Sequence, residues 1–169
     1  GYLMDTKVYT VNTQQGKSSE IKVDDQVTRG AVKAFKVDSV TGEFRPQGDA
    51  SLEGALYGLY AREDIVHPDA KTGLIHPAGT LVEEKIFGEE GWIEFSNLYQ
   101  GLYYLKEITP PSGYKADAQE YDLDLSWIDG ETPVVSKEVT VKEEVKKQAF
   151  QILKVSGNGS SMEQPKVQG

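Results

Sequence analysis

Three ionisable residues, Lys36, Glu107 and Glu143, stand at positions where the alternation of the sequence would place apolar side chains. Successive side chains of a strand point to opposite faces, so in "YYLKEI" the carboxylate of Glu107 shares a face with Tyr103 and Leu105. An unpaired charge in a core costs several kcal/mol. We therefore expect these three side chains to meet one another in the interior.

A lysine and a carboxylate each occur twice in this kind of setting. Lys36 in "AVKAFKV" corresponds to Lys154 in "FQILKV", and Glu143 in "VTVKEEV" corresponds to Asp25 in "IKVDDQV". For a single strand, a buried salt bridge or a lysine that extends its amine to the surface is the ordinary explanation. Recurrence at equivalent places of two segments favours a functional cluster instead.

Burial of such a trio predicts a specific chemistry. An apolar environment lowers the pKa of a lysine and raises the pKa of a glutamate, which gives a neutral amine beside a protonated acid. The amine could attack a carboxyl or carboxamide within bonding reach while the acid polarises the carbonyl and transfers protons. The product would be a side-chain amide between the first and last strands, a covalent link suited to an extracellular protein without cysteine.

The elements that must position these residues are predicted to be almost entirely β. Short runs of alternating or β-branched residues are separated by turn sequences such as "SVTGE", "FGEEGW" and "TPPSGY". Their spacing predicts an all-β sandwich in which helix is a minor component. We expect strands over residues 31–38, 54–61, 81–85, 92–96, 101–108, 120–126 and 134–145.

An internal repeat organises the chain. "GYLMDTKVYTV" from Gly1 resembles "GYKADAQEYDL" from Gly113, and "IKVDDQV" resembles "VTVKEEV" further along. This pattern predicts the closing strands of one repeat over residues 1–29, a complete sandwich module over 30–147, and the opening strand of a following repeat over 148–169. We therefore expect the chain to be a fragment of an extended tandem array.

Composition excludes several classes of function. Of the 169 residues 38% are hydrophobic, and no apolar run approaches the length of a membrane span, so no membrane insertion is expected. A net charge of −9 without a basic stripe disfavours nucleic acid as a partner. The absence of cysteine removes disulfides, thiol nucleophiles and cysteine-bound zinc, and no cofactor is expected.

Three other groups of residues suit packing or turns better than chemistry. His67 and His76 flank Asp69 in "HPDAKTGLIHP", but each histidine precedes a proline, so a long surface loop is favoured over a metal site. Asp38 in "DSVTGE" lacks the ligand density of a calcium loop and indicates a β-turn. A set of aromatic residues could form a carbohydrate platform, but packing in the core or at sheet edges is favoured. These residues are Tyr57, Tyr60, Trp92, Tyr99, Tyr103 and Tyr104.

Longer motifs carry a family resemblance. "AFKVDSVTG", "LEGALYGLYARED", "GWIEFSNLYQGLYYLKEITPPSGY" and the closing valine-rich strand resemble the collagen-binding protein B-type, or pilin SpaA-type, repeat of Gram-positive surface proteins. The resemblance covers about residues 30–147. It implies a prealbumin-like Greek-key β-sandwich with inverse immunoglobulin topology, used as a stalk module in adhesins and pilins.

Many members of this family form an isopeptide bond between a first-strand lysine and a last-strand asparagine or aspartate, assisted by a glutamate. By resemblance, Lys36 matches the amine and Glu107 the catalytic helper. The last-strand position holds Glu143, which is one methylene longer than aspartate, so we expect a noncovalent cluster, with a Lys36–Glu143 isopeptide as the alternative. Asp25 is the acceptor equivalent of the upstream repeat, and Lys154 is the lysine equivalent of the downstream repeat.

The predicted function is therefore mechanical and not enzymatic, beyond autocatalytic isopeptide formation. We expect a secreted, cell-wall-associated stalk module on the surface of a Gram-positive bacterium, with neighbouring repeats of the same chain as partners. The alternative is an adhesin module that recognises a host matrix protein or glycan through the 62–90 insertion. An accessory domain of a hydrolase is a third possibility.

Overall fold

The computed structural model describes residues 1–152, and within them the regular elements are nine strands. None of the described residues forms a helix that is long and apolar enough to cross a membrane. The strands are β1 Arg29–Asp38, β2 Leu56–Ala61, β3 Ile65–Val66, β4 Leu74–His76, β5 Leu81–Ile86, β6 Trp92–Leu98, β7 Leu102–Thr109, β8 Glu120–Asp124 and β9 Val134–Glu143.

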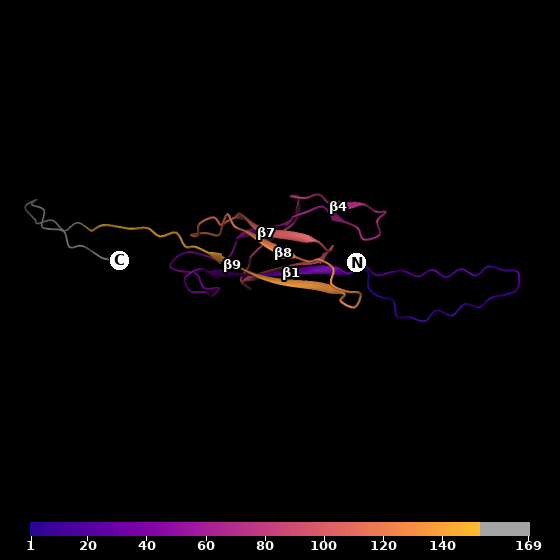
Figure 1. The fold of residues 1–169 in the computed structure, drawn as a ribbon. Coiled ribbons are helices and arrows are strands. Elements are labelled where there is room, and N and C mark those ends of the chain that lie inside the picture. The colour runs from indigo at the N-terminus through magenta and orange to yellow at the C-terminus, as the bar shows by residue number, and fades with distance from the viewer. Residues whose placement is uncertain (153–169) are drawn as a thin grey trace, which may run out of the picture.

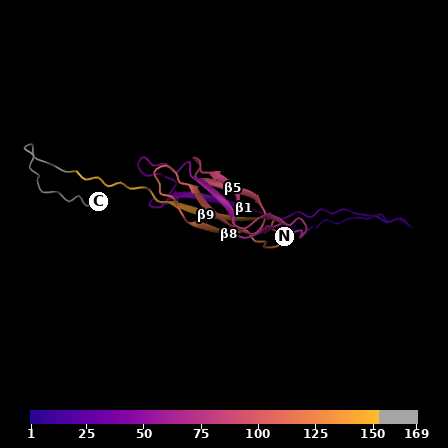
Figure 2. The same cartoon turned by 90° about the horizontal axis from the view of Figure 1, so that it is seen from above.

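Two sheets form a sandwich, as predicted. One sheet has the order β6-β1-β9 and the other β5-β2-β7-β8, while β3 and β4 form a small separate hairpin. Figures 1 and 2 show the strands running along the long axis of the molecule. Side chains from both sheets form the main hydrophobic core, to which β1 contributes Val32 and Ala34, and β7 contributes Tyr103 and Leu105. These are the faces that the alternation of the sequence predicts.

The first and last strands of the sandwich lie side by side and run in the same direction. β1 pairs with β9 along its whole length, from Arg29 opposite Val134 to Asp38 opposite Glu143. On its other side β1 pairs antiparallel with β6. A parallel pair needs a long connection between its strands, and here the rest of the module supplies it.

All seven predicted strands are present, with shifted ends, and two strands were missed. The segment predicted as a long surface loop contains the hairpin of β3 and β4, in which Ile65 pairs with His76. Strands this short carry too few residues for an alternating pattern to be visible in the sequence. β5 belongs to the larger sheet, so residues 62–80 and 87–90 of the 62–90 insertion lie outside it.

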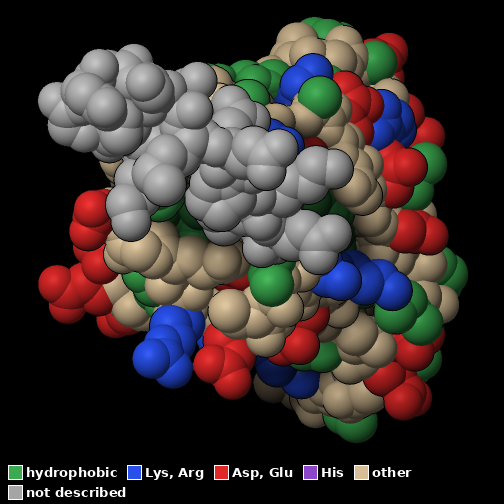
Figure 3. Space-filling model, turned by 90° about the vertical axis from the view of Figure 1, so that its left-hand side faces the viewer, with side chains coloured by type: hydrophobic (Ala, Val, Ile, Leu, Met, Phe, Trp, Pro, Cys, Tyr) green, Lys and Arg blue, Asp and Glu red, His purple; other side chains and the backbone are tan. Residues whose placement is uncertain are grey.

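The two terminal segments leave the sandwich at opposite ends (Figure 1). Residues 1–28 are extended and form a single isolated β-bridge, between Tyr2 and Val27, where closing strands were predicted. Regular strands need neighbours that pair their backbone groups. This stretch contacts the sandwich only near its two ends, so most of its backbone has no such neighbour. At the other end residues 147–152 lead away, and Figure 3 shows acidic and basic side chains interspersed around that end.

Candidate functional site: a buried lysine and two glutamates

Lys36 and Glu143 form an ion pair between β1 and β9. The Lys36 Nζ atom lies 2.6 Å from Glu143 Oε1, and both side chains are completely shielded from solvent. In the parallel register Lys36 stands opposite Val141, so its side chain reaches diagonally to the next inward-facing residue of β9. The charged pair therefore joins the first and last strands inside the core.

Two aromatic rings wall the lysine. Its Nζ atom lies 5.1 Å from the ring centroids of both Tyr57 and Phe87, a distance at which a ring face attracts a cation. The two rings meet edge to face at 5.4 Å. The Tyr57 hydroxyl also donates a hydrogen bond of 3.0 Å to Glu143 Oε1. Tyr57 is thus part of the site, whereas the sequence indicated only that it packs.

Glu107 approaches the pair from the facing sheet. It lies on β7 opposite Tyr57 of β2, and it is 8% exposed. Its Oε2 atom accepts a hydrogen bond of 2.6 Å from the backbone N–H of Asp117. Glu107 Oε1 and Glu143 Oε2 are buried and have no hydrogen-bond partner within residues 1–152. We call the set of Lys36, Tyr57, Glu107 and Glu143 the buried cluster.

Burial controls protonation in this cluster. Desolvation, together with the negative charge of Glu143, raises the pKa of Glu107 to about 7, although the Asp117 N–H and Lys36 oppose the rise. Desolvation also lowers the pKa of Lys36, against the opposing effect of its ion pair with Glu143. A proton on Glu107 would provide the donor that the two unpartnered carboxylate oxygens lack. The arrangement can therefore hold a lysine with reduced basicity beside a glutamic acid.

The structure brings together the three residues that the sequence predicted to meet, and places the other two apart from them. Asp25, the upstream acceptor equivalent, is exposed in the N-terminal segment. Lys154, the downstream lysine equivalent, lies outside the described residues. Within the described residues, Glu143 is therefore the acidic partner of Lys36.

Asp38 is a third buried carboxylate, at the end of β1. It accepts hydrogen bonds from the backbone N–H groups of Val40 and Thr41, from the Gln47 side-chain amide and from the Tyr114 hydroxyl, at 2.8–3.0 Å. Burial alone would raise the pKa of Asp38, but these hydrogen bonds bring it below its usual value. We call this set the Asp38 cluster. The predicted turn is present, and Asp38 organises it by accepting hydrogen bonds from its backbone N–H groups.

The histidine segment forms no converging ligand set. His67 Nδ1 lies 3.0 Å from Asp69 Oδ1, while His76 lies in the β3–β4 hairpin opposite Ile65. In the part of the chain that the structure describes, no group of three histidine or acidic residues could hold a metal ion. Of the aromatic set, Tyr57 and Tyr103 are buried, while Tyr60 and Tyr104 stack at 5.1 Å.

Comparison with known proteins identifies similar domains. The family model described as SpaA, prealbumin-like fold domain, matches residues 30–140. The Bacillus anthracis TIE protein is similar in structure, with a TM-score of 0.60 and 19% identity over 86% of this chain. The group B streptococcus pilus 2b backbone protein gives a TM-score of 0.48 and 23% identity over 79% of this chain.

This chain spans 23% of the TIE protein chain and 46% of the pilus 2b chain. No curated protein matches the sequence. The family match shows the predicted prealbumin-like fold over residues 30–140, a range that contains Lys36, Tyr57 and Glu107 and ends three residues before Glu143. The structural similarity to the TIE protein agrees with it.

Proposed function

Because the chain belongs to the SpaA family of prealbumin-like domains, we propose that it is a stalk module of a protein on the outer surface of a Gram-positive bacterium. The module would separate a functional tip from the cell wall, and neighbouring repeats of the same chain would be its partners. In this function residues 30–147 form one complete unit of the array. The sandwich acts by resisting extension and carries out no reaction on an external substrate.

The observation that carries this proposal is the parallel pairing of β1 with β9. The chain enters the module at the start of β1 and leaves it after the end of β9, at opposite ends of the sandwich (Figure 1). Tension along the chain therefore pulls the two strands past each other. All hydrogen bonds between them are then loaded together, whereas a hairpin pulled at its open end would lose its bonds one at a time.

The buried cluster strengthens the same pair of strands. Sliding β1 against β9 separates Lys36 from Glu143, which leaves two charges without partners in the core. Removing one member of a buried ion pair typically costs about 3–5 kcal/mol. The cluster therefore adds a side-chain connection between β1 and β9, the two strands on which tension would act.

A covalent form of this connection is the second candidate state, favoured by the 2.6 Å approach of Lys36 Nζ to Glu143 Oε1. In that reaction Lys36 first passes one proton to Glu143, and the neutral amine attacks the carboxyl carbon of the protonated Glu143. A C–N bond forms, the C–OH bond breaks, and the oxygen leaves as water with a second proton from the amine. Glu107 would carry the proton from the amine to the leaving oxygen. Reactants and products balance without an oxidant or cofactor.

Intact mass and single-molecule stretching test the proposal together. We expect the unmodified mass for the ion-paired form, and a high unfolding force that falls in Lys36→Ala. Lys33→Ala is the matched control, since Lys33 lies on the outward face of β1 over the Trp92 ring. A wild-type mass one water below the value expected from the sequence would establish the covalent form, provided that Lys36→Ala shows its full expected mass. Equal unfolding forces in wild type and Lys36→Ala would contradict the strengthening role of the cluster.

The adhesin alternative is separated from a stalk by binding. A stalk module shows no saturable binding to matrix proteins or glycans. Saturable binding that disappears when residues 67–73, between β3 and β4, are shortened would assign a ligand-binding function instead.

A further inference from the structure

We propose that the end of the sandwich at the start of β1 is a docking surface for the preceding repeat of the same chain, and that neighbouring repeats join there without a free linker. The inference rests on the proposed function as a tandem stalk. It adds a specific surface, a specific occupant and a restricted junction, none of which follows from the stalk function alone.

Backbone hydrogen bonds fasten the N-terminal segment to this end of the sandwich. The N–H of Met4 donates to the carbonyl of Gly130 at 2.7 Å, in the loop between β8 and β9. The Gly1 nitrogen donates to the Gln100 side-chain oxygen at 2.7 Å. The N–H of Arg29 donates to the Pro133 carbonyl at 2.9 Å. The N-terminal segment is therefore held at Gly130 and Gln100, and the start of β1 at Pro133, all on one end of the module.

The same hydrogen-bond pattern occurs at the other end of the module. In both places the chain at a Gly-Tyr pair is bridged to a valine at the end of a valine-rich stretch. The upstream set is the Tyr2–Val27 bridge, Leu3 N–H to Gln26 carbonyl at 2.8 Å, and Thr28 N–H to Gly1 carbonyl at 3.1 Å. The downstream set is the Tyr114–Val145 bridge, Lys115 N–H to Glu144 carbonyl at 2.8 Å, and Lys146 N–H to Gly113 carbonyl at 2.8 Å.

These matched contacts support assigning residues 1–28 to the closing part of a preceding repeat. A side-chain pair recurs as well, because the Tyr9 hydroxyl donates to Asp5 and the Tyr121 hydroxyl donates to Asp117. The N-terminal contacts to Gly130 and Gln100 are then contacts between two repeats. By the same register, the exposed Lys115 and its neighbours would meet the following repeat.

The chain between the two repeats has no slack. Val27 still belongs to the upstream bridge, and β1 begins at Arg29. A second connection, the hydrogen bond from the Met4 N–H to the Gly130 carbonyl, fixes the stretch that follows Tyr2 to the sandwich. Two attachment points on separate stretches of chain restrict bending in a way that a single flexible connection would not.

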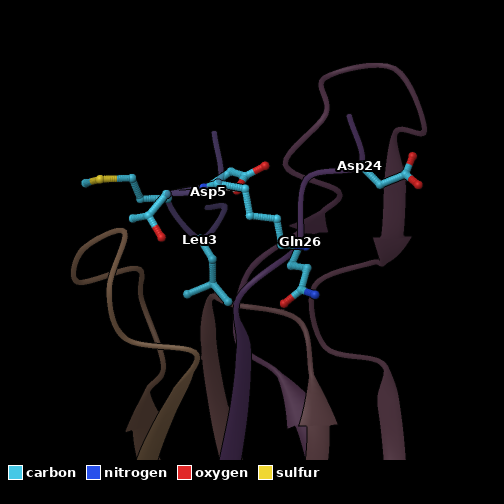
Figure 4. Close-up of a pocket in the computed structure, with 7 residues that line it drawn as sticks. Leu3, Asp5, Asp24 and Gln26 are labelled. Atoms are coloured by element: carbon cyan, nitrogen blue, oxygen red, sulfur yellow. Dashed lines mark hydrogen bonds between the residues drawn. The ribbon is translucent and has the colours of Figure 1, made fainter. Parts of the chain in front are cut away.

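Apolar side chains on this end have room for a larger partner. Trp127, Ile128 and Val134 are 52%, 60% and 45% exposed, and they lie in or beside the loop that holds Met4. The body of the preceding repeat would cover them. Figure 4 shows the hollow above this end, where Leu3 points toward the ends of the strands and Asp24 points away. Residues of the N-terminal segment alone line that hollow, so we assign it to the upstream repeat.

An engineered disulfide tests the junction, because the chain contains no cysteine. A Cβ atom placed on Gly130 would lie 3.4 Å from the Met4 Cβ, close to the disulfide spacing of about 3.5–4.5 Å. We expect Met4→Cys/Gly130→Cys in the 169-residue chain to form an intramolecular disulfide in air, detected by a mass lower by two hydrogens. Met4→Cys/Gly88→Cys is the matched control and should keep both thiols, since a Cβ at Gly88 has no neighbour within 4 Å.

Two results would overturn the junction. One is free thiols in a Met4→Cys/Gly130→Cys protein that retains the circular dichroism and melting of Gly130→Cys alone. The other is disulfide-linked dimers, which would assign this surface to contacts between separate copies. Either result would leave the stalk function intact, because that function is tested by the force that unfolds β1 from β9.

Discussion

Strand β1 carries two buried ionisable side chains on one face, Lys36 and Asp38, and their surroundings differ. Both oxygens of Asp38 accept hydrogen bonds, from two backbone N–H groups, an amide and a tyrosine hydroxyl. Around Lys36, by contrast, one oxygen each of Glu107 and Glu143 is buried without a hydrogen-bond partner in the described part of the chain. The two sites are separated by one residue along the strand, so burial alone does not explain the difference.

The difference in pKa follows from these donors. Asp38 has its pKa lowered and remains charged, while the pKa of Glu107 rises to about 7, so that it holds a proton near neutral pH. A fully hydrogen-bonded carboxylate stabilises the turn that follows β1. A carboxyl group left without enough donors costs stability, and groups of that kind concentrate at functional sites. The comparison therefore separates the fully hydrogen-bonded Asp38 cluster from the buried cluster, for which we propose a role in strengthening the β1–β9 pair.

Removing the lysine should give the largest effect. We expect Lys36→Ala to lower the free energy of unfolding by about 3–5 kcal/mol, because Glu143 and Glu107 then share the core without a cation. Urea unfolding followed by tryptophan fluorescence measures the change. Lys33→Ala, on the outward face of the same strand, should cost less than about 1 kcal/mol.

A double replacement separates the charge from the packing. Lys36→Met/Glu143→Met removes both charges and keeps most of the volume, so it should recover most of the stability that Lys36→Ala loses. If Lys36→Ala unfolds at the same urea concentration as the wild type, the ion pair does not hold the strands together.

The pH dependence of stability should distinguish the two carboxyl groups. The pKa of Glu107 is raised in the folded state from 4.5 to about 7, so the folded protein binds the proton more tightly. Its stabilising contribution is fully present below pH 4.5 and is lost as the pH rises through about 7, with a total on the order of 3 kcal/mol. Asp38 has the opposite sign, because its contribution is lost as the pH falls below its ordinary pKa of 3.8.

Glu107→Gln provides the test of that assignment. The amide keeps an oxygen for the Asp117 N–H and cannot titrate. Melting temperatures between pH 4.5 and 8 should therefore lose the decline that the wild type shows. The same decline in both proteins would mean that another group titrates in this range.

Strand periodicity made the central residues of the site predictable. Successive side chains of a strand point to opposite faces, and this alternation placed Lys36, Glu107 and Glu143 on buried faces. Three buried charges were then expected to lie near one another. The sequence did not reveal that Tyr57 donates to Glu143, since that contact depends on how β2 of one sheet packs over β9 of the other. The fold was predictable for the same reason, except where β3 and β4 are too short to show a period.

The Asp38 cluster was missed because its donors are far apart in the sequence. Tyr114 and Gln47 are brought to Asp38 by the turns at one end of the sandwich. The signal that was available is local, since an aspartate followed by turn residues commonly accepts hydrogen bonds from the backbone two or three positions on. That signal indicated a turn but not its burial.

The smallest predicted effects compare the two tyrosines, each of which donates a hydrogen bond of 3.0 Å to a buried carboxylate. Tyr114→Phe should cost about 0.5–1 kcal/mol, because Asp38 keeps its three other donors. Tyr57→Phe should cost more, about 1.5–2 kcal/mol, because Glu143 already has one oxygen without a partner and would depend on Lys36 alone. Urea unfolding of both variants gives the ranking. If Tyr114→Phe lowered the free energy of unfolding more than Tyr57→Phe did, the additional hydrogen-bond donors around Asp38 would not explain the tolerance of the Asp38 cluster to losing one of them.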